Sequence, residues 1–462
     1  MTGKSKAKRT DPSVGTGFQE YRRRDQRRTP GTLASSPSHA DPSYDRIDVT
    51  RYTSRQFHDL EKIRLWPRVW QMVCRQEHIP QAGDFTVYDI VDKSFLVVRQ
   101  VDGTIKAFYN SCLHRGRPLA TEPGHAMQLR CPFHGFTWRL DGQLKEIPCR
   151  WDFPHVKDEE CALPEAHVDT WGGWVFLNMA AQPMPLREYL GPLPAHFANW
   201  GLERSYLGVH VARVVNCNWK AALEAFSEAW HSHDTHPEIL PYTGDTNSQY
   251  DVWPEHPYVD RMITPFAVPS PYLEGRIGEQ EIVDLMLNMP GGRARQPTYI
   301  PLPPGMTGRS LLGEMLRGVC SSTWWTDMSH ASDCELLDAI LYNVFPNFVP
   351  WGGYGTTINY RYRPNGDDHE SSIMEVMLLM RYPKGRVRPP TAKVHWLAPD
   401  EPWSNAFELG PLGPVFDQDM SNLTHLQRGL KSAVKGELLL SRYQESRLRH
   451  FHQLLERHLS DH

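Results

Sequence analysis

The chain has 462 residues, a mass of 53.2 kDa and a formal net charge of -4 at pH 7. Because single hydrophobic cores rarely extend beyond about 250–300 residues, this length predicts two domains. The balanced charge and the sequence pI of 6.6 argue against polyanion binding, so we expect no nucleic-acid partner. No apolar run approaches the ~20 residues of a membrane span, and no apolar segment follows Met1 as in a secretion signal. We therefore expect a cytoplasmic protein with no membrane partner.

The first 42 residues differ in composition from the rest of the chain. Lysine, arginine, serine, proline and glycine are frequent there, and no apolar periodicity offers a face for a core. This composition predicts a disordered basic tail over residues 1–42. A solvated tail is the favoured interpretation over a nucleic-acid or partner contact.

Residues 43–180 form the first predicted domain. A near-helical apolar spacing after Ser54 predicts a helix over 54–70, a segment that can pack on the following domain. Asp102-Gly103 and Asp141-Gly142 predict hairpin turns. Alternating and apolar runs predict short strands over residues 85–88, 95–98, 105–109, 136–140 and 174–177.

Residues 181–462 form the second predicted domain, in which helices and strands are mixed. The sequence predicts a helix over 219–231 and a strand over 373–378. A final helix is predicted because apolar residues recur at intervals of three and four. These residues are Leu448, Phe451, Leu455 and Leu459.

Two cysteine and histidine pairs stand in the β-rich first domain. They are Cys112-x-His114 and Cys131-x-x-His134, in a chain whose eight cysteines favour metal ligation over disulfides. Two thiolates and two imidazoles are the ligand set of a Rieske [2Fe-2S] cluster. A structural zinc site would use the same atoms, but it usually pairs Cys with Cys and His with His. The alternating order therefore favours the cluster. Cys149 and Cys161 have no partner at ligand spacing and are interpreted as ordinary thiols.

Histidines are dense again in the second domain, after the predicted helix start. Two imidazoles and one carboxylate on one face form the usual ligand set of an O₂-activating non-haem iron. His231 and His236 are one candidate pair, and His233 with His236 is a competing pair. A spacing of five places two side chains about 140° apart on an ideal helix. The helix must therefore distort or end there, which Pro237 favours.

These motifs resemble those of the α subunits of Rieske-type ring-hydroxylating oxygenases. The resemblance includes Asn218-Trp219-Lys220 followed by an acid-x-x-His-x₄-His-Pro pattern, and it runs from about residue 47 to 430. Respiratory Rieske proteins carry an extra cysteine in each box where this chain has Arg117 and Phe133, which favours the oxygenase branch. The resemblance identifies Cys112, His114, Cys131 and His134 as the cluster ligands.

The resemblance also implies the ligands of the mononuclear iron. His231 and His236 would be joined by a distant aspartate before a Gln-x-Gly element, here Asp419 with Asp417 as the alternative. Both aspartates could instead be helix-capping acids. Glu228 takes the place of an acid that links the iron site to the cluster histidine of a neighbouring subunit. Aspartate is common at that position, so the longer side chain is a departure, as is Ala225 where an amide is often found.

The implied fold is α+β, with an antiparallel β Rieske domain and a catalytic domain whose antiparallel sheet is wrapped by helices in the helix-grip (START/Bet v 1-like) manner. The implied function is that of a terminal oxygenase. Electrons from NAD(P)H reach the cluster through a reductase or ferredoxin, and the cluster passes them to a mononuclear Fe(II). This iron activates O₂ to hydroxylate an apolar aromatic or polycyclic substrate. Dihydroxylation is the favoured reaction, with monooxygenation or demethylation as the alternative. The family assembles as head-to-tail trimers, alone or as α₃β₃ with a small β subunit.

The substrate pocket is expected between residues 236 and 409, a region rich in methionine and aromatic side chains. Most of these side chains are expected to be core. Arg261 and Arg361 are candidate partners for a substrate carboxylate. Two other classes of protein share part of this pattern. An electron carrier would need the cluster but no open iron site, and a zinc-stabilised binding protein would need neither redox chemistry nor O₂.

Overall fold

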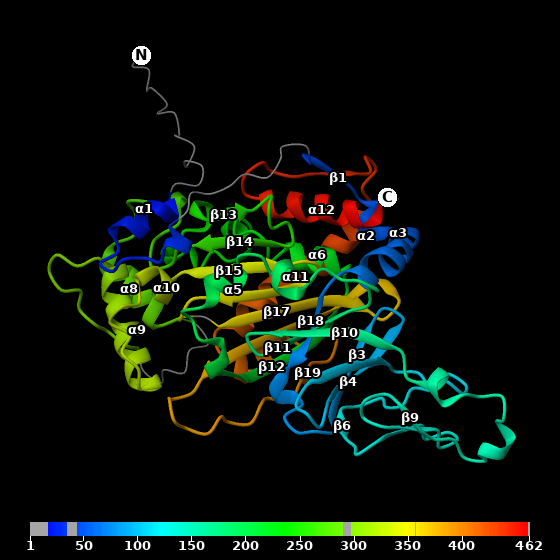
Figure 1. Ribbon diagram of the computed structural model, residues 1–462. Coiled ribbons are helices and arrows are strands. Elements are labelled where there is room, and N and C mark those ends of the chain that lie inside the picture. The colour runs from blue at the N-terminus through cyan, green and yellow to red at the C-terminus, as the bar shows by residue number, and fades with distance from the viewer. Residues whose placement is uncertain (1–16, 35–43, 290–296, 356, 461–462) are drawn as a thin grey trace.

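Two large sheets organise the chain in the computed structural model, which describes residues 17–34, 44–289, 297–355 and 357–460. They are a seven-stranded sheet in the first half and an eight-stranded sheet in the second, and Figure 1 shows them side by side. The expected α+β architecture is thus confirmed. In the order of the first sheet, its strands are β2 (Gln71–Arg75), β11 (Trp174–Asn178), β10 (Glu165–Trp171), β5 (Ile105–Tyr109), β4 (Lys93–Arg99), β3 (Asp84–Ile90) and β6 (Gly124–His125).

The hairpins of the first half follow the turn residues seen in the sequence. Asp102-Gly103 joins β4 to β5, with Gly103 at φ +85°, where a side chain would be strained. A small sheet of β7 (Leu129–Arg130), β8 (Thr137–Trp138) and β9 (Leu144–Glu146) follows. The strand predicted over 136–140 shortens to β8 because the register shifts between Thr137 and Trp138. In Figure 1 the lobe that carries β6 and β9 projects from the body, away from α6 and α11.

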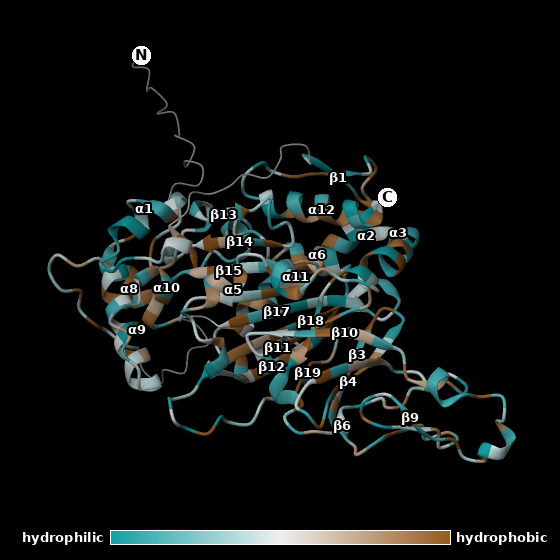
Figure 2. Cartoon of the chain, viewed as in Figure 1, coloured by the Kyte–Doolittle hydropathy of each residue, from teal (hydrophilic) through white to brown (hydrophobic). Residues whose placement is uncertain are grey.

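The second sheet is covered on one face by helices. Its strands run in the order β13 (Gln249–Val252), β14 (Val259–Thr264), β15 (Ala339–Val344), β16 (Phe348–Gly352), β17 (Ile358–Asn365), β18 (Asp368–Arg381), β12 (Ser205–Val215) and β19 (His395–Trp396). The covering helices are α6 (Trp219–Glu224), α11 (Leu412–Lys431) and α12 (Ser446–Leu459). The predicted final helix is confirmed as α12, whose four apolar residues are buried. Figure 2 shows the apolar residues gathered on the strands of both sheets.

Smaller elements complete the fold. Strands β1 (Arg46–Asp48) and β20 (Glu437–Leu439) pair with each other. Helices α8 (Glu279–Leu287), α9 (Gly308–Trp324) and α10 (Asp333–Leu337) lie together beside the second sheet (Figure 1). No helix in the described ranges is both long and apolar enough to cross a membrane.

A buried ion pair joins the two halves on the other face of the second sheet. Nε and Nη2 of Arg361 lie 2.5 and 2.7 Å from the two carboxylate oxygens of Glu375, and Nη1 of Arg361 donates to the carbonyl oxygens of Met72 and Val73 in β2. Burial raises the pKa of Glu375, but Arg361 and Arg363 outweigh it and hold that pKa well below its usual range. The ion pair therefore stays charged and fixes the first sheet to the second.

The expectation that Arg261 or Arg361 binds a substrate carboxylate is wrong for this structure. Arg361 is held by Glu375, and Nη2 of the fully buried Arg261 lies 2.6 Å from a carboxylate oxygen of Asp251. Both arginines form buried ion pairs between neighbouring strands of the second sheet. The sequence could not show this because each acid lies on a neighbouring strand whose register only the fold sets.

The predicted disordered tail is wrong for residues 17–34, and the rest of that prediction lies outside the described residues. Helix α1 (Gly17–Arg24) and a short 3-10 turn (Gly31–Leu33) pack on the half that holds the second sheet, through the buried side chains of Phe18 and Leu33. Asp25 also pairs with Arg309 of α9, at 2.9 Å. Two isolated apolar residues and one distant arginine leave no periodicity for sequence analysis to detect.

The helix predicted over 54–70 forms in three pieces. Ser54 caps α3 (Arg55–Leu60), and a π-helical turn (Glu61–Leu65) and a 3-10 turn (Trp66–Arg68) follow. The segment packs on the half that holds the second sheet, where Glu61 and Lys220 form a fully buried ion pair at 2.6 Å. The irregular turns bring Glu61 onto α6.

The junction between the halves can be tested with Arg361→Met. This change leaves the buried Glu375 without its main cationic partner, and such a break costs about 3–5 kcal/mol. We expect the urea midpoint of unfolding to fall, as followed by circular dichroism. Arg55→Met is the matched control, since Arg55 pairs with Asp367 on the surface. Equal midpoints for the two variants would contradict the role of the buried pair.

Candidate metal centres

Helix α6 ends early, and this ending creates the site. Asn218 caps its start by accepting from the Lys220 N–H at 3.1 Å, but regular helix stops at Glu224 instead of continuing to 231 as predicted. The chain turns before α7 (Ser232–Thr235), so that His231 precedes this helix and His236 follows it. The two histidines, five residues apart, therefore do not lie on one continuous helix, and their side chains can face the same point.

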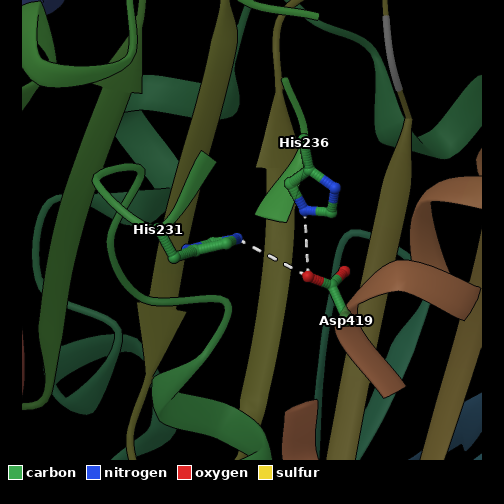
Figure 3. A group of neighbouring side chains, drawn as sticks. All are labelled: His231, His236 and Asp419. Atoms are coloured by element: carbon green, nitrogen blue, oxygen red, sulfur yellow. Dashed lines mark hydrogen bonds and ion pairs between the residues drawn. The ribbon is translucent and has the colours of Figure 1, made fainter. Parts of the chain in front are cut away.

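His231, His236 and Asp419 converge, as Figure 3 shows. One ligand atom from each lies within 4.8 Å of the others. Oδ1 of Asp419, on α11, is 3.0 Å from Nε2 of His236 and 3.6 Å from Nε2 of His231. His236 and Asp419 are buried, whereas the side chain of His231 is 28% exposed. The three residues can hold one metal ion with open coordination positions.

The remaining ring nitrogens have hydrogen-bond partners that orient them. Nδ1 of His231 lies 2.7 Å from Oε1 of Glu228, and Nδ1 of His236 lies 2.7 Å from Oε1 of Gln418. Since both oxygens accept, Nδ1 carries the proton and Nε2 faces Asp419 in each ring. Burial lowers the pKa of His231, but Glu228 and Asp419 outweigh it and raise that pKa to about 9. A metal ion binding here would displace that proton.

Gln418 was missed by the sequence analysis. Its only signal was its position beside Asp419, and the fold reveals that it faces His236 instead of solvent. Such partners of ligand histidines typically change metal affinity or activity by about 10–100-fold when replaced.

The competing residues lie elsewhere. His233 is 37% exposed, and its ring packs against Tyr272 at 4.2 Å between centroids. Asp417 accepts from the N–H groups of Trp403 and Ser404 at 2.6 and 3.2 Å, so it caps a 3-10 turn. The geometry therefore brings Asp419 to the two histidines and leaves Asp417 outside the group.

The two cysteine and histidine boxes form loops of matching backbone. In each loop the glycine N–H donates to the cysteine carbonyl, Gly116 to Cys112 at 2.8 Å and Gly135 to Cys131 at 3.0 Å. These glycines have φ of +77° and +78°, which other residues rarely adopt. The boxes are thus two copies of one turn, as a shared cluster requires.

The cysteines and histidines of these loops point to different environments. Cys112 and Cys131 are buried, while His114 and His134 reach the surface with ring centroids 4.6 Å apart. Burial raises the pKa of Cys112. For Cys131 the N–H groups of Phe133 and His134 outweigh burial and lower the pKa. Two adjacent sulfurs inside and two adjacent imidazoles outside fit a [2Fe-2S] cluster with one iron on each pair.

Asp419→Ala and Asp417→Ala separate the two candidate carboxylates. We expect Asp419→Ala to lose the mononuclear metal because the site then has only two ligands. Asp417→Ala should keep the metal and lose only a cap, a cost of about 0.5–2 kcal/mol. Metal analysis of the purified variants decides between them, and full metal content in Asp419→Ala would rule out its role as a ligand.

Comparisons with known proteins agree with this geometry. Biphenyl 2,3-dioxygenase subunit alpha of Rhodococcus jostii (strain RHA1) is 32% identical over 198 residues, which are 41% of this chain and 43% of the relative. The glycine betaine monooxygenase oxygenase subunit of Pseudomonas aeruginosa (strain UCBPP-PA14) is 28% identical over 194 residues, which are 41% of this chain and 44% of the relative. The match thus spans about two fifths of the length of these relatives.

Solved structures share the fold over nearly the whole chain. A naphthalene 1,2-dioxygenase variant bound to phenanthrene superposes with a TM-score of 0.64 at 18% identity, covering 91% of this chain and 94% of that one. A quaternary ammonium Rieske monooxygenase superposes with a TM-score of 0.63 at 15% identity, covering 92% and 96%.

Two family models match along the chain. Residues 69–157 match the Rieske [2Fe-2S] domain, and residues 195–461 match the ring-hydroxylating α subunit (catalytic domain). Members of these families are oxidoreductases that use a [2Fe-2S] cluster and a non-haem iron. Since the second match covers more than half of the sequence, this chain belongs to the ring-hydroxylating oxygenase α-subunit family, with a Rieske [2Fe-2S] domain ahead of its catalytic domain.

Proposed function

We propose that this protein is a terminal oxygenase that hydroxylates an organic substrate with O₂. The convergence of His231, His236 and Asp419 on one point carries the proposal, because two imidazoles and a carboxylate are the ligand set of O₂-activating Fe(II). When bound, the cluster supplies single electrons and the iron supplies O₂ activation. The residues Cys112, His114, Cys131 and His134 hold the cluster in this proposal.

Electrons would pass between subunits. The projecting lobe that carries the cluster loops extends away from α6 and α11, so another copy's lobe is better placed to serve the iron (Figure 1). Glu228, whose side chain is 10% exposed, accepts a hydrogen bond from Nδ1 of His231, and the half-exposed Trp230 follows it two residues later in the chain. We assign Glu228 the role of the electron bridge in a homotrimer or α₃β₃ assembly. A reductase or ferredoxin would deliver electrons from NAD(P)H.

An apolar aromatic or polycyclic compound is the first candidate substrate. Phe226, Tyr360 and Phe416 lie together on the helix-covered side of the sheet, with ring centroids 5.1 to 6.1 Å apart. Asp419 lies within electrostatic reach of Tyr360, whose pKa is raised chiefly by burial. This largely buried aromatic cluster near Asp419 gives the surroundings of the site the apolar, aromatic character that suits a ring substrate. The similarity to biphenyl dioxygenase supports ring dihydroxylation and a role in aromatic catabolism.

Monooxygenation of a quaternary ammonium compound is the second candidate. The similarity to a glycine betaine monooxygenase and to a quaternary ammonium Rieske monooxygenase favours it, and aromatic rings also attract such cations. Both reactions use the same ligand set, so the iron site does not discriminate between them.

Metal content and His231→Ala test the proposed function. We expect about three irons and two acid-labile sulfides per chain, because a [2Fe-2S] cluster and one further iron are present. His231→Ala should keep the electron paramagnetic resonance signal of the reduced cluster and form no product from aromatic, polycyclic and quaternary ammonium candidates. Two irons and two sulfides in the unmodified protein would instead indicate an electron carrier, and zinc without sulfide would indicate a zinc protein.

Glu228→Gln tests the electron bridge. The amide keeps the size of the side chain but loses the charge that polarises His231, so we expect both metals to remain and cluster reoxidation by O₂ and substrate to slow by about 10–100-fold. Stopped-flow absorbance follows that reoxidation. Glu238→Gln, at an exposed acid of the same segment, is the control. An unchanged rate in Glu228→Gln would remove its bridging role.

A further inference from the structure

A small cavity lies beside the C-terminal end of α9, which Figure 1 shows on the side of the molecule opposite the projecting lobe. Its volume is about 60 Å³, enough for a few water molecules or one small ion. Residues of α9, of the end of β18 and of the segments before β12 and after β16 line it. Two of them are Arg204 and Arg381, and no acidic residue lines the cavity in the described ranges. The cavity therefore has two positive charges and no matching acid.

The register of the second sheet brings these two arginines together. Arg381 ends β18, and Ser205 at the start of β12 lies opposite it. Arg204 immediately precedes Ser205, and its carbonyl oxygen accepts from the N–H of Tyr382. Like charges that are close in a partly buried place repel each other unless an anion lies near them. Burial, together with the charge of Arg204, lowers the pKa of Arg381 to about 10, so Arg381 remains charged at neutral pH.

The guanidinium group of Arg381 has a buried donor without an acceptor. Its Nη2 donates to the carbonyl oxygen of Trp200, and its Cζ lies 4.7 and 4.8 Å from the ring centroids of Trp324 and Tyr354. Aromatic rings attract a cation but do not neutralise its charge. Nε of Arg381 is buried and has no hydrogen-bond partner in the described part of the chain. An acceptor from outside the chain would therefore stabilise this arrangement.

Other arginines near this cavity are matched by acids of the chain. Nη1 of Arg309, on α9, lies 2.6 Å from Oδ1 of Asp338. Nη2 of Arg317, on the same helix, lies 2.6 Å from Oδ1 of Asp333. Arg381 differs from both, since none of its contacts within the described residues is with a carboxylate.

Two acids that adjoin the cavity already have other partners. Asp327 follows a lining residue in the chain, but it accepts from the N–H and the hydroxyl of Ser329, both at 2.9 Å. Glu335 is within electrostatic reach of Tyr354, but it accepts from the indole of Trp200 at 3.0 Å. The chain therefore offers its two arginines at this cavity without committing an acid to them.

We propose that this cavity binds one small oxyanion, a carboxylate or a phosphate, with the Nε–H of Arg381 as the buried donor and Arg204 as the second positive charge. A guanidinium N–H matches the oxygens of both groups, and such charge-assisted hydrogen bonds are stronger than neutral ones. Lys384 and Arg386 follow in the exposed loop after β18 and add positive charge to the approach. The elements that line the cavity hold none of the candidate metal ligands, so the proposal does not rest on the oxygenase function.

Isothermal titration calorimetry of the metal-loaded protein tests the proposal without measuring turnover. The probes are sodium phosphate and sodium acetate, added near neutral pH in Tris chloride at constant ionic strength. We expect at least one probe to bind at one site per chain. Arg204→Gln should weaken that binding by about 5–10-fold because a positive charge beside the anion is lost. Arg187→Gln, at an exposed position of α4 (Leu186–Tyr189), is the matched control and should bind as the wild type does.

The two probes distinguish the two sources of an oxyanion. Tighter binding of acetate identifies a carboxylate ligand, and tighter binding of phosphate identifies a phosphate ligand. Because Arg204 is exposed, Arg204→Gln should keep the wild-type thermal unfolding curve, so its weaker binding would not result from unfolding.

Arg381→Lys provides a second test. Lysine keeps the positive charge but has no guanidinium Nε–H, so we expect it to weaken binding more than Arg204→Gln does. The proposal is overturned if neither probe binds, if Arg204→Gln binds as tightly as Arg187→Gln, or if a folded Arg381→Lys variant binds as tightly as the wild type. None of these outcomes bears on the iron centre, which iron content and product formation test separately.

Discussion

The buried pair of Arg361 and Glu375 is the constraint on which the two-part structure depends. A charged pair inside a protein is stable only if its remaining donors and acceptors are satisfied, and here the carbonyl groups of Met72 and Val73 complete the set. One face of the eight-stranded sheet of the catalytic domain therefore packs against the Rieske domain. The opposite face is left for the helices and the candidate iron site.

The site itself depends on where α6 stops. A continuous helix would direct His231 and His236 to different sides, whereas the turn after Glu224 aims both rings at Asp419 on α11. Glu228 and Gln418 then fix the orientations of the two rings through hydrogen bonds at Nδ1, on the side away from Asp419. The arrangement is pre-organised, because each of the two candidate histidines has a second partner that holds its ring in place.

Charge matching is a general feature of this interior, because the buried carboxylates of Glu61, Asp251 and Glu375 each face a buried cation. Asp419 instead faces two imidazoles, as a metal ligand does. Its surroundings are therefore those of a residue that receives a metal ion in the proposed function.

Local motifs in the sequence determined the candidate cluster ligands, because Cys-x-His and Cys-x-x-His boxes imply tight turns whose geometry is set within a few residues. The fold followed from the family that these motifs resemble. The short hairpins at Asp102-Gly103 and the final helix were also determined by local pattern. Only the tertiary structure decided between Asp419 and Asp417, since both lie on one helix and differ in the direction that they face. The same holds for Gln418, for the anchoring of residues 17–34 and for the partners of Arg261 and Arg361. Each of these depends on contacts between residues far apart in the chain, which local pattern does not encode.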